Sequence, residues 1–155
     1  MKALIIYSTK HGATKKIAES IAGRLSGAVL HDADCGEKIT FSDYDCIILG
    51  SPLTAGRISK AVKKIAAEHA DELQNKTIGL FLSGLQESEA ETYFKDNFPA
   101  ELLERAAAKA FLGGIFDPEK CGFISRKLIK AAAKLDSYTS TIDEAKITTF
   151  AEALS

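Results

Sequence analysis

Residues 3–14 limit what this chain can fold into more than any other stretch. The apolar run Ala3–Tyr7 fits a buried strand, and the loop that follows it, Ser8–Thr14, holds three hydroxyl side chains and one glycine. A helical pattern begins directly after this loop. A strand that passes through such a loop into a helix brings backbone N–H groups and hydroxyls to the positive end of the helix. The stretch therefore predicts a phosphate-binding loop, with Thr14 as the helix cap and Gly27 as the helix stop.

The rest of the chain alternates between apolar runs and helical patterns. Strands are predicted at 2–7, 28–31, 46–49, 77–82 and 109–113. Helices are predicted at 15–25, at 58–69, at 87–108 with a break at Phe98-Pro99, and over two final stretches that carry Ile124–Leu135 and Ile142–Leu154.

This alternation, with strands that are apolar on both faces, is typical of a parallel sheet covered by helices on both sides. Right-handed crossovers favour the strand order 2-1-3-4-5. We therefore predict an α/β doubly wound five-stranded parallel sheet with helices on both faces. We expect residues 1–155 to form a single domain.

Composition excludes several classes of partner. The net charge is -1, so no overall positive field favours nucleic acid. The longest apolar stretches span about seven residues, whereas a membrane helix needs about 20. Met1-Lys2 leads straight into a strand and leaves no room for a signal peptide. We expect a cytoplasmic protein.

The cysteines and histidines form no recognisable metal-binding, disulfide or catalytic-triad pattern. Cys35, Cys46 and Cys121 are widely spaced and form no C-x-x-C pair, so the sequence favours neither disulfides nor a zinc or iron–sulfur site. Cys46 is expected as a reduced thiol buried in a strand. His31 and His69 show neither metal-ligand spacing nor a catalytic-triad arrangement.

Three loops are expected to meet at one place. In a doubly wound sheet, ligands bind outside the carboxyl ends of the strands, where the strand order reverses between strands one and three. The loops 8–14, 51–57 and 83–88 would converge there.

These loops carry a resemblance to a known family. Residues 5–14 resemble the signature of flavodoxins, in which two aliphatic residues and an aromatic lead into a hydroxyl-rich loop closed by glycine and threonine. The segments Gly50–Gly56 and Ser83–Leu85 resemble the second and third flavin loops of that fold. The segment Gly113–Pro118, together with the basic helix after it, is similar to the subgroup that includes menaquinone-dependent protoporphyrinogen oxidase.

The resemblance implies that the cofactor is flavin mononucleotide (FMN). The residues that it implies as FMN-binding are Ser8, Thr9, Lys10, His11, Gly12, Ala13, Thr14, Pro52, Leu53, Thr54, Ala55, Gly56, Arg57, Ser83, Gly84 and Leu85.

The residue types of the loop 8–14 are suited to binding a single terminal phosphate. The hydroxyls of Ser8, Thr9 and Thr14 and the amides of 9–14 can hold a dianion. Neither the dinucleotide pattern G-x-G-x-x-G nor the triphosphate pattern G-x-x-x-x-G-K-S/T is present. Lys10 and His11 either add positive charge or point to solvent.

The part of the site that would face the flavin ring departs from electron-carrier flavodoxins. Ala55 stands where a stacking aromatic is expected, and Leu85 where a second could be. Gly56 matches the family position at which a peptide flips toward the reduced flavin, unless it serves only as a turn residue. Arg57 stands where carriers tend to be acidic, and it would make the second reduction potential less negative, unless it is merely solvated.

The helices after the third loop are less informative. Tyr93 and Phe94 are expected in the core rather than over a flavin, and the acidic residues of 86–91 on a solvated face. Five basic residues favour an ordinary amphipathic surface helix over membrane contact. They are Lys120, Arg126, Lys127, Lys130 and Lys134.

Three functional hypotheses remain. The first is an FMN-binding redox protein, either an electron carrier or an oxidoreductase, whose partner is a redox protein, a quinone or another small molecule. The second is a protoporphyrinogen oxidase-type enzyme, against which the acidic stretch 86–91 counts. The third is an interaction domain without cofactor. A phosphoacceptor receiver is excluded, because Tyr7-Ser8 and Gly50-Ser51 occupy the places of its acidic residues.

Overall fold

A parallel sheet forms the centre of the protein. The computed structural model describes residues 1–117 and 138–155. Five parallel strands lie in the order β2-β1-β3-β4-β5, which confirms the predicted fold class. Their bounds are β1 Ala3–Tyr7, β2 Val29–Asp32, β3 Cys46–Pro52, β4 Thr77–Ser83 and β5 Ala108–Phe111.

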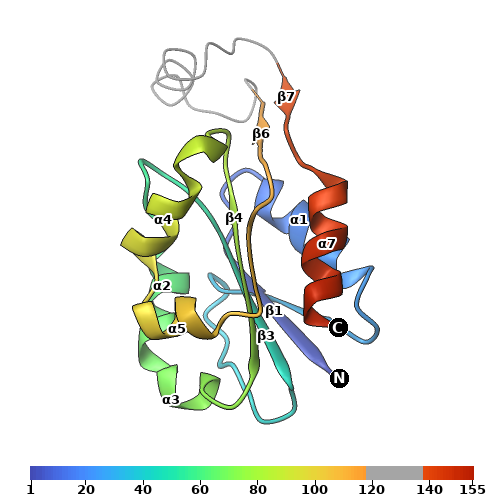
Figure 1. The fold of residues 1–155 in the computed structure, drawn as a ribbon, viewed down its shortest axis with the longest axis vertical. Helices are drawn as coiled ribbons and strands as arrows, with labels where there is room; N and C mark the ends of the chain where they lie inside the picture. Colours follow the sequence, from blue (N-terminus) through green and yellow to red (C-terminus); the bar gives the residue numbers. More distant parts are fainter. Residues whose placement is uncertain (118–137) are drawn as a thin grey trace.

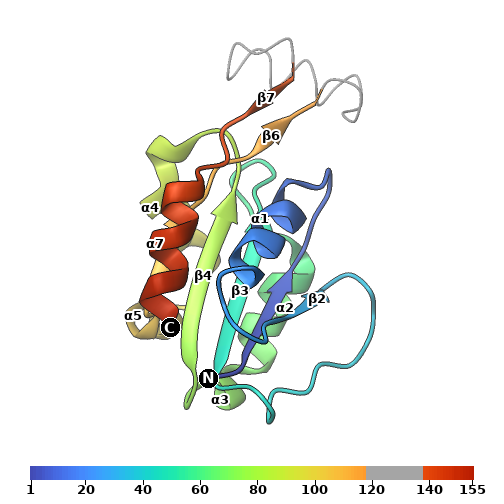
Figure 2. The same ribbon diagram turned by 90° about the vertical axis from the view of Figure 1, so that its right-hand side faces the viewer.

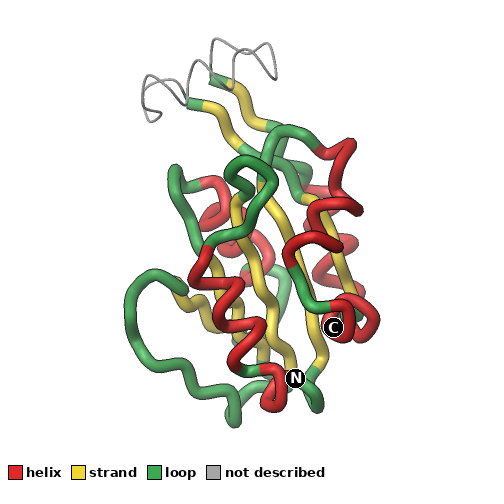
Figure 3. The backbone as a smooth tube through the Cα atoms, turned by 90° about the vertical axis from the view of Figure 1, so that its left-hand side faces the viewer, coloured by secondary structure: helices red, strands yellow, loops and turns green. Residues whose placement is uncertain are grey.

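Helices cover both faces of this sheet (Figures 1 and 2). One face carries α1 (Ala13–Ala22) and α7 (Glu144–Leu154), which contact each other. The other face carries α2 (Lys60–Glu68), α3 (Ala70–Leu73), α4 (Ala90–Asn97) and α5 (Ala100–Arg105), with the short 3-10 turn η1 (Glu87–Glu89) before α4. Figure 3 shows the strands as a single layer between the two sets of helices.

The alternating side chains of the central strands build two cores. Ile5 and Ile48 point to the face of α1 and α7, whereas Ile6 and Leu49 point to the face of α2 and α4. All four side chains are fully buried. Strands that are apolar at every position thus supply both cores at once, as expected for a sheet covered on both sides.

Both ends of the first helix differ from the sequence expectation. The first helix begins at Ala13 after Gly12, whose φ is 97°, so Gly12 is the N-cap and Thr14 lies inside the helix. A positive φ is inexpensive for glycine alone, which is why the cap is a residue without a side chain. The helix ends at Ala22, with Gly23 as its cap, rather than at Gly27.

The break at Phe98-Pro99 is confirmed. Helix α4 ends at Asn97, and Phe98 has extended backbone angles, as a residue before proline prefers. Helix α5 follows at Ala100. Phe98 itself is buried in the core beneath these helices.

A small hairpin beyond β5 was not predicted. Strands β6 (Ile115–Phe116) and β7 (Thr139–Ser140) pair antiparallel. The Thr141 amide donates to the Gly114 carbonyl at 2.8 Å next to this pair. The predicted helix over 124–135, the five basic residues from Lys120 to Lys134 and Cys121 lie outside the described residues.

Cys46 is the buried strand thiol that the sequence predicts. It is completely enclosed on β3, and burial, assisted by the nearby Asp45 carboxylate, raises its pKa to about 11. Its thiol therefore stays protonated and unreactive at neutral pH. Cys35 is exposed.

Among the described residues, no helix is both long and apolar enough to cross a membrane.

Candidate functional site

The loop 8–12 leaves β1 and delivers the chain to the start of α1. The Ser8 amide donates to the Gly50 carbonyl at 3.1 Å, which fixes the loop to the neighbouring strand β3. The Gly12 amide donates to Thr9 Oγ1 at 3.0 Å, closing the loop on itself. A Cβ added to Gly12 would have no atom within 4 Å, so the space over this turn is open.

The amides at the start of α1 are available for a ligand. The first bond of the helix runs from the Lys16 amide to the Gly12 carbonyl at 3.0 Å. Within the described part of the chain, the amides of Ala13, Thr14 and Lys15 have no backbone or side-chain acceptor. Unpaired amides at the positive end of a ten-residue helix form an anion-binding arrangement.

The three loop hydroxyls differ in what they can still donate. Ser8 Oγ donates to Asp34 Oδ2 at 2.6 Å, so its proton points to a carboxylate. Thr9 Oγ1 accepts from Gly12 and keeps its own proton free. Thr14 Oγ1 and Ser83 Oγ lie 2.7 Å apart, and such a pair uses one of its two protons and leaves the other to donate.

Ser83 and Gly84 join the three predicted loops. The buried contact between Thr14 and Ser83 links the first loop to the third. The Leu53 amide donates to the Ser83 carbonyl at 3.1 Å and links the second loop to the third. The Gly84 amide also donates to the Gly113 carbonyl at 3.0 Å. The expected convergence of the loops at the carboxyl ends of β1, β3 and β4 is confirmed.

Gly114, in the segment after β5, packs directly against the backbone of Gly84 in the third loop. A Cβ at Gly114 would lie 2.8 Å from the Gly84 backbone, so the two segments touch only because this residue lacks a side chain.

The second loop is a tight two-residue hairpin. The Thr54 amide donates to the Arg57 carbonyl at 2.9 Å, and the Arg57 amide donates back to the Thr54 carbonyl at 3.1 Å. The two central residues, Ala55 and Gly56, have φ of 52° and 76°. Two positive φ values define a type I′ turn, in which glycine fits and alanine costs of order 1 kcal/mol. Gly56 is therefore a turn residue in this structure.

Asn97 at the end of α4 holds this hairpin in place through hydrogen bonds to its backbone. Its Nδ2 donates to the Gly56 carbonyl at 2.9 Å and to the Tyr93 carbonyl at 2.8 Å, and its Oδ1 accepts from the Ile58 amide at 3.1 Å. The side chain is buried, with all of its groups paired. Sequence reasoning missed Asn97; the only signal was a polar residue directly before the buried Phe98.

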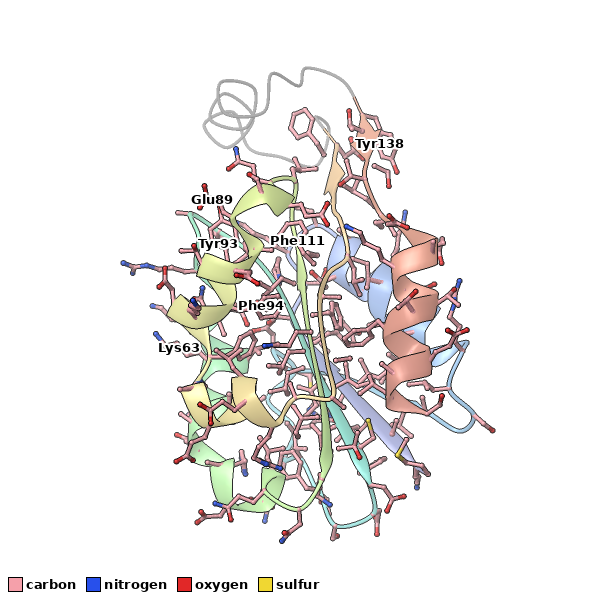
Figure 4. All side chains as sticks on the ribbon, in the orientation of Figure 1. Lys63, Glu89, Tyr93, Phe94, Phe111 and Tyr138 are labelled. Atoms are coloured by element: carbon pink, nitrogen blue, oxygen red, sulfur yellow. The ribbon has the colours of Figure 1, made fainter. Side chains whose placement is uncertain are left out.

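Tyr93 stands beside the hairpin, whereas Phe94 belongs to the core. A Cβ on Gly56 would lie 3.4 Å from Tyr93 Cε1, which places the tyrosine ring against this glycine. Phe94 is buried in the cluster under α4, as predicted for both aromatics (Figure 4). Tyr93 is half-buried and packs against the same core cluster, so its predicted place in the core is confirmed in part.

The remaining predicted residues lie at the open rim of the loops. Lys10, Thr54, Ala55 and Arg57 are exposed. His11, Ala13, Pro52, Leu53, Gly84 and Leu85 are half-buried. The side chains of Ala55 and Leu85 leave the second and third loops without an aromatic of their own.

Acidic groups border the first loop. Asp34 accepts from Ser8, and its amide donates to Asp32 Oδ1 at 2.9 Å. Burial, followed by the Asp32 charge, raises the pKa of Tyr7 at the end of β1. Tyr7 therefore remains an uncharged phenol at neutral pH, beneath the loop.

Comparison with known proteins agrees with this geometry. The family model described as a flavodoxin domain matches residues 4–143, which include all three loops. The chain belongs to this flavodoxin family.

A curated relative of this flavodoxin chain is the protoporphyrinogen IX dehydrogenase [quinone] of Leishmania major. The two are 25% identical over 122 residues, which cover 74% of this chain and 53% of the relative. The chain thus spans about half the length of the relative that it matches.

Solved flavodoxin structures share the fold. The flavodoxin of Streptococcus pneumonia matches with a TM-score of 0.58 and 16% identity, over 99% of this chain and 97% of that one. The flavodoxin of Fusobacterium nucleatum, bound to flavin mononucleotide, matches with a TM-score of 0.51 and 18% identity, over 76% and 72% of the two chains.

Removal of the Asn97 amide should loosen the second loop. Asn97→Leu leaves the Gly56 carbonyl and the Ile58 amide unpaired, and Asn97→Asp keeps the acceptor but loses both donors. We expect each to lower the free energy of unfolding by about 1–3 kcal/mol in urea denaturation. Asn75→Asp, at an exposed site, should change it by less than about 0.5 kcal/mol. A wild-type value for Asn97→Asp would contradict the role of the two donated bonds.

Proposed function

We propose that this chain binds FMN across its three loops and exchanges electrons through the flavin. The observation that carries the proposal is the set of unpaired amides of Ala13–Lys15 at the start of α1, beneath the open turn at Gly12. These amides suit a terminal phosphate, and membership of the flavodoxin family supports FMN as its bearer. The flavodoxin of Fusobacterium nucleatum, whose structure contains FMN, has the same fold and also supports FMN as the ligand.

The donors of the loop divide into two groups. The α1 amides, the free proton of Thr9 and the remaining proton of the Thr14–Ser83 pair would hold the phosphate. Ser8 is engaged with Asp34 and would join only by turning its hydroxyl away from that carboxylate. Its part in phosphate binding stays a prediction.

The hairpin 54–57 and Leu85 would border the isoalloxazine ring. When bound, the flavin supplies one- and two-electron chemistry. Because Ala55 and Leu85 offer no aromatic face, the ring would be less enclosed than between two aromatics, and Tyr93 is the aromatic that lies against the hairpin. The open side leaves room for a redox partner protein, a quinone or another small molecule.

Asn97 limits what the hairpin backbone can do. The Gly56 carbonyl is held by Asn97, and the Arg57 amide is held by Thr54. A flip of the peptide between Gly56 and Arg57 would break both hydrogen bonds. The peptide before Gly56 has no such restraint among the described residues, since no donor contacts the Ala55 carbonyl.

A second candidate is protoporphyrinogen oxidation with a quinone acceptor. The Leishmania major relative favours it, although the match covers about half of that protein. The acidic segment 86–91 counts against it, and Glu87 is paired with Lys146 on α7.

The phosphate should dominate cofactor binding. Riboflavin has the same ring without the phosphate, so we expect FMN to bind at least about 100-fold more tightly in fluorescence titrations. Thr9→Val and Thr14→Val should weaken FMN about tenfold or more and leave riboflavin unchanged. Thr149→Val, on the exposed side of α7, is the matched control. Equal affinities for FMN and riboflavin would exclude this phosphate site.

Arg57 should tune the flavin potential. A positive charge at the ring side stabilises the negatively charged reduced flavin, so Arg57→Ala should make the second reduction potential more negative. The expected shift is of order 1 kcal/mol, roughly 40 mV for one electron. Spectroelectrochemistry measures it, with Lys64→Ala on α2 as the charge control. An unchanged or less negative potential in Arg57→Ala would remove this role.

Turnover assays separate the two functions. We expect the FMN-loaded chain to accept electrons from reduced ferredoxin-type donors, seen as bleaching of the flavin. With protoporphyrinogen and a quinone, it should form porphyrin no faster than free FMN does, as followed by porphyrin fluorescence. Faster, enzyme-dependent porphyrin formation would make the second candidate the function.

A further inference from the structure

A group of potential metal ligands lies in the turn after β2, outside the three loops. His31 stands on β2, and Cys35 and Glu37 follow in the turn. One ligand atom from each residue lies within 4.8 Å of the other two, and His31 Nε2 is 3.8 Å from Cys35 Sγ. No other such group of three or more exists among the described residues.

The spacing of these atoms is close to that of a bound metal. In a tetrahedral zinc site, a nitrogen and a sulfur ligand lie about 3.6 Å apart. The distance between His31 and Cys35 is near this value without any metal. Cys35 and Glu37 are exposed and His31 is half-buried, so an ion in solution can reach all three.

The backbone of the turn contacts the sulfur of Cys35. Gly36 has a φ of 76°, and this reversal aims the Glu37 amide at Cys35 Sγ, at 3.5 Å. The Cys–Gly–Glu turn thus holds the Cys35 sulfur close to the backbone of Glu37.

The local charge also attracts a cation. Residues 31–38 include the acidic Asp32, Asp34 and Glu37 and a single basic residue, Lys38. The sulfur, imidazole and carboxylate set suits zinc, whereas magnesium and calcium prefer oxygen ligands alone.

We propose that His31, Cys35 and Glu37 bind one Zn²⁺, with the fourth position open to water or an outside ligand. None of these three residues belongs to the three loops proposed to bind FMN. The sequence alone gave no sign of it, because positions 31, 35 and 37 match no metal motif until the turn folds back on β2.

The test is a titration of the full chain with Zn²⁺ and with Co²⁺. The chain carries Cys121→Ser, since Cys121 lies outside the described residues, and a thiol-free reductant is used. Calorimetry should give one Zn²⁺ per chain with micromolar or tighter affinity. Co²⁺ should produce a thiolate-to-cobalt charge-transfer band in the difference spectrum. The buried Cys46, with its pKa of about 11, should not contribute.

Variants separate this site from general surface binding. Cys35→Ser, His31→Asn and Glu37→Gln should each weaken Zn²⁺ binding at least about tenfold, and Cys35→Ser should abolish the charge-transfer band. His69→Asn is the matched control, because His69 also sits beside a carboxylate, with Nδ1 2.7 Å from Glu72 Oε1, but has no cysteine. Thermal melting without metal should show that all variants fold.

Three results would overturn the proposal. The first is the absence of saturable Zn²⁺ binding up to about 100 µM, a range in which a three-ligand site should fill. The second is wild-type affinity in Cys35→Ser or His31→Asn. Wild-type affinity in Glu37→Gln alone would remove that residue from the ligand set and would overturn the site as stated.

Discussion

The register of the parallel strands decides where every loop of the site begins. Tyr7 pairs with Gly50, Gly50 with Phe81, and Pro52 with Ser83, so β1, β3 and β4 end at nearly the same level. This register depends on Gly50, because a Cβ there would lie 2.0 Å from the Phe81 ring. Three loops that are distant in sequence therefore leave the sheet side by side, and short hydrogen bonds between them complete the arrangement.

The sheet could be predicted because its strands follow from patterns among neighbouring residues. Parts of the site could not, because they depend on contacts between residues far apart in the sequence. Strands apolar at every position and the Phe98-Pro99 break can be read from neighbouring residues. Two of the three partners of Asn97 are backbone groups at Gly56 and Ile58, about 40 residues earlier, and no local pattern reveals them. The hairpin of β6 and β7 was missed for the same reason, since its two-residue strands are far apart in sequence.

The first loop and the second loop of the proposed FMN site are built by different means. After the first loop, α1 presents unpaired amides that follow from helix geometry. The hairpin 54–57 depends on specific partners, chiefly Asn97 and the positive φ of Ala55 and Gly56. The resemblance to flavodoxins is accordingly strongest in the first loop. In the second loop, Ala55 and Arg57 differ from the residues expected in electron-carrier flavodoxins.

The contact between Thr14 and Ser83 also bears on how the protein folds. These residues are 69 positions apart, and their hydroxyls meet only after β4 has docked on β3 and β3 on β1. We expect this contact to form late in folding. Bringing the two residues together costs the conformational entropy of the chain between them before their hydrogen bond can stabilise the structure. The first loop emerges early during synthesis but reaches its final form only when more than half of the chain is in place.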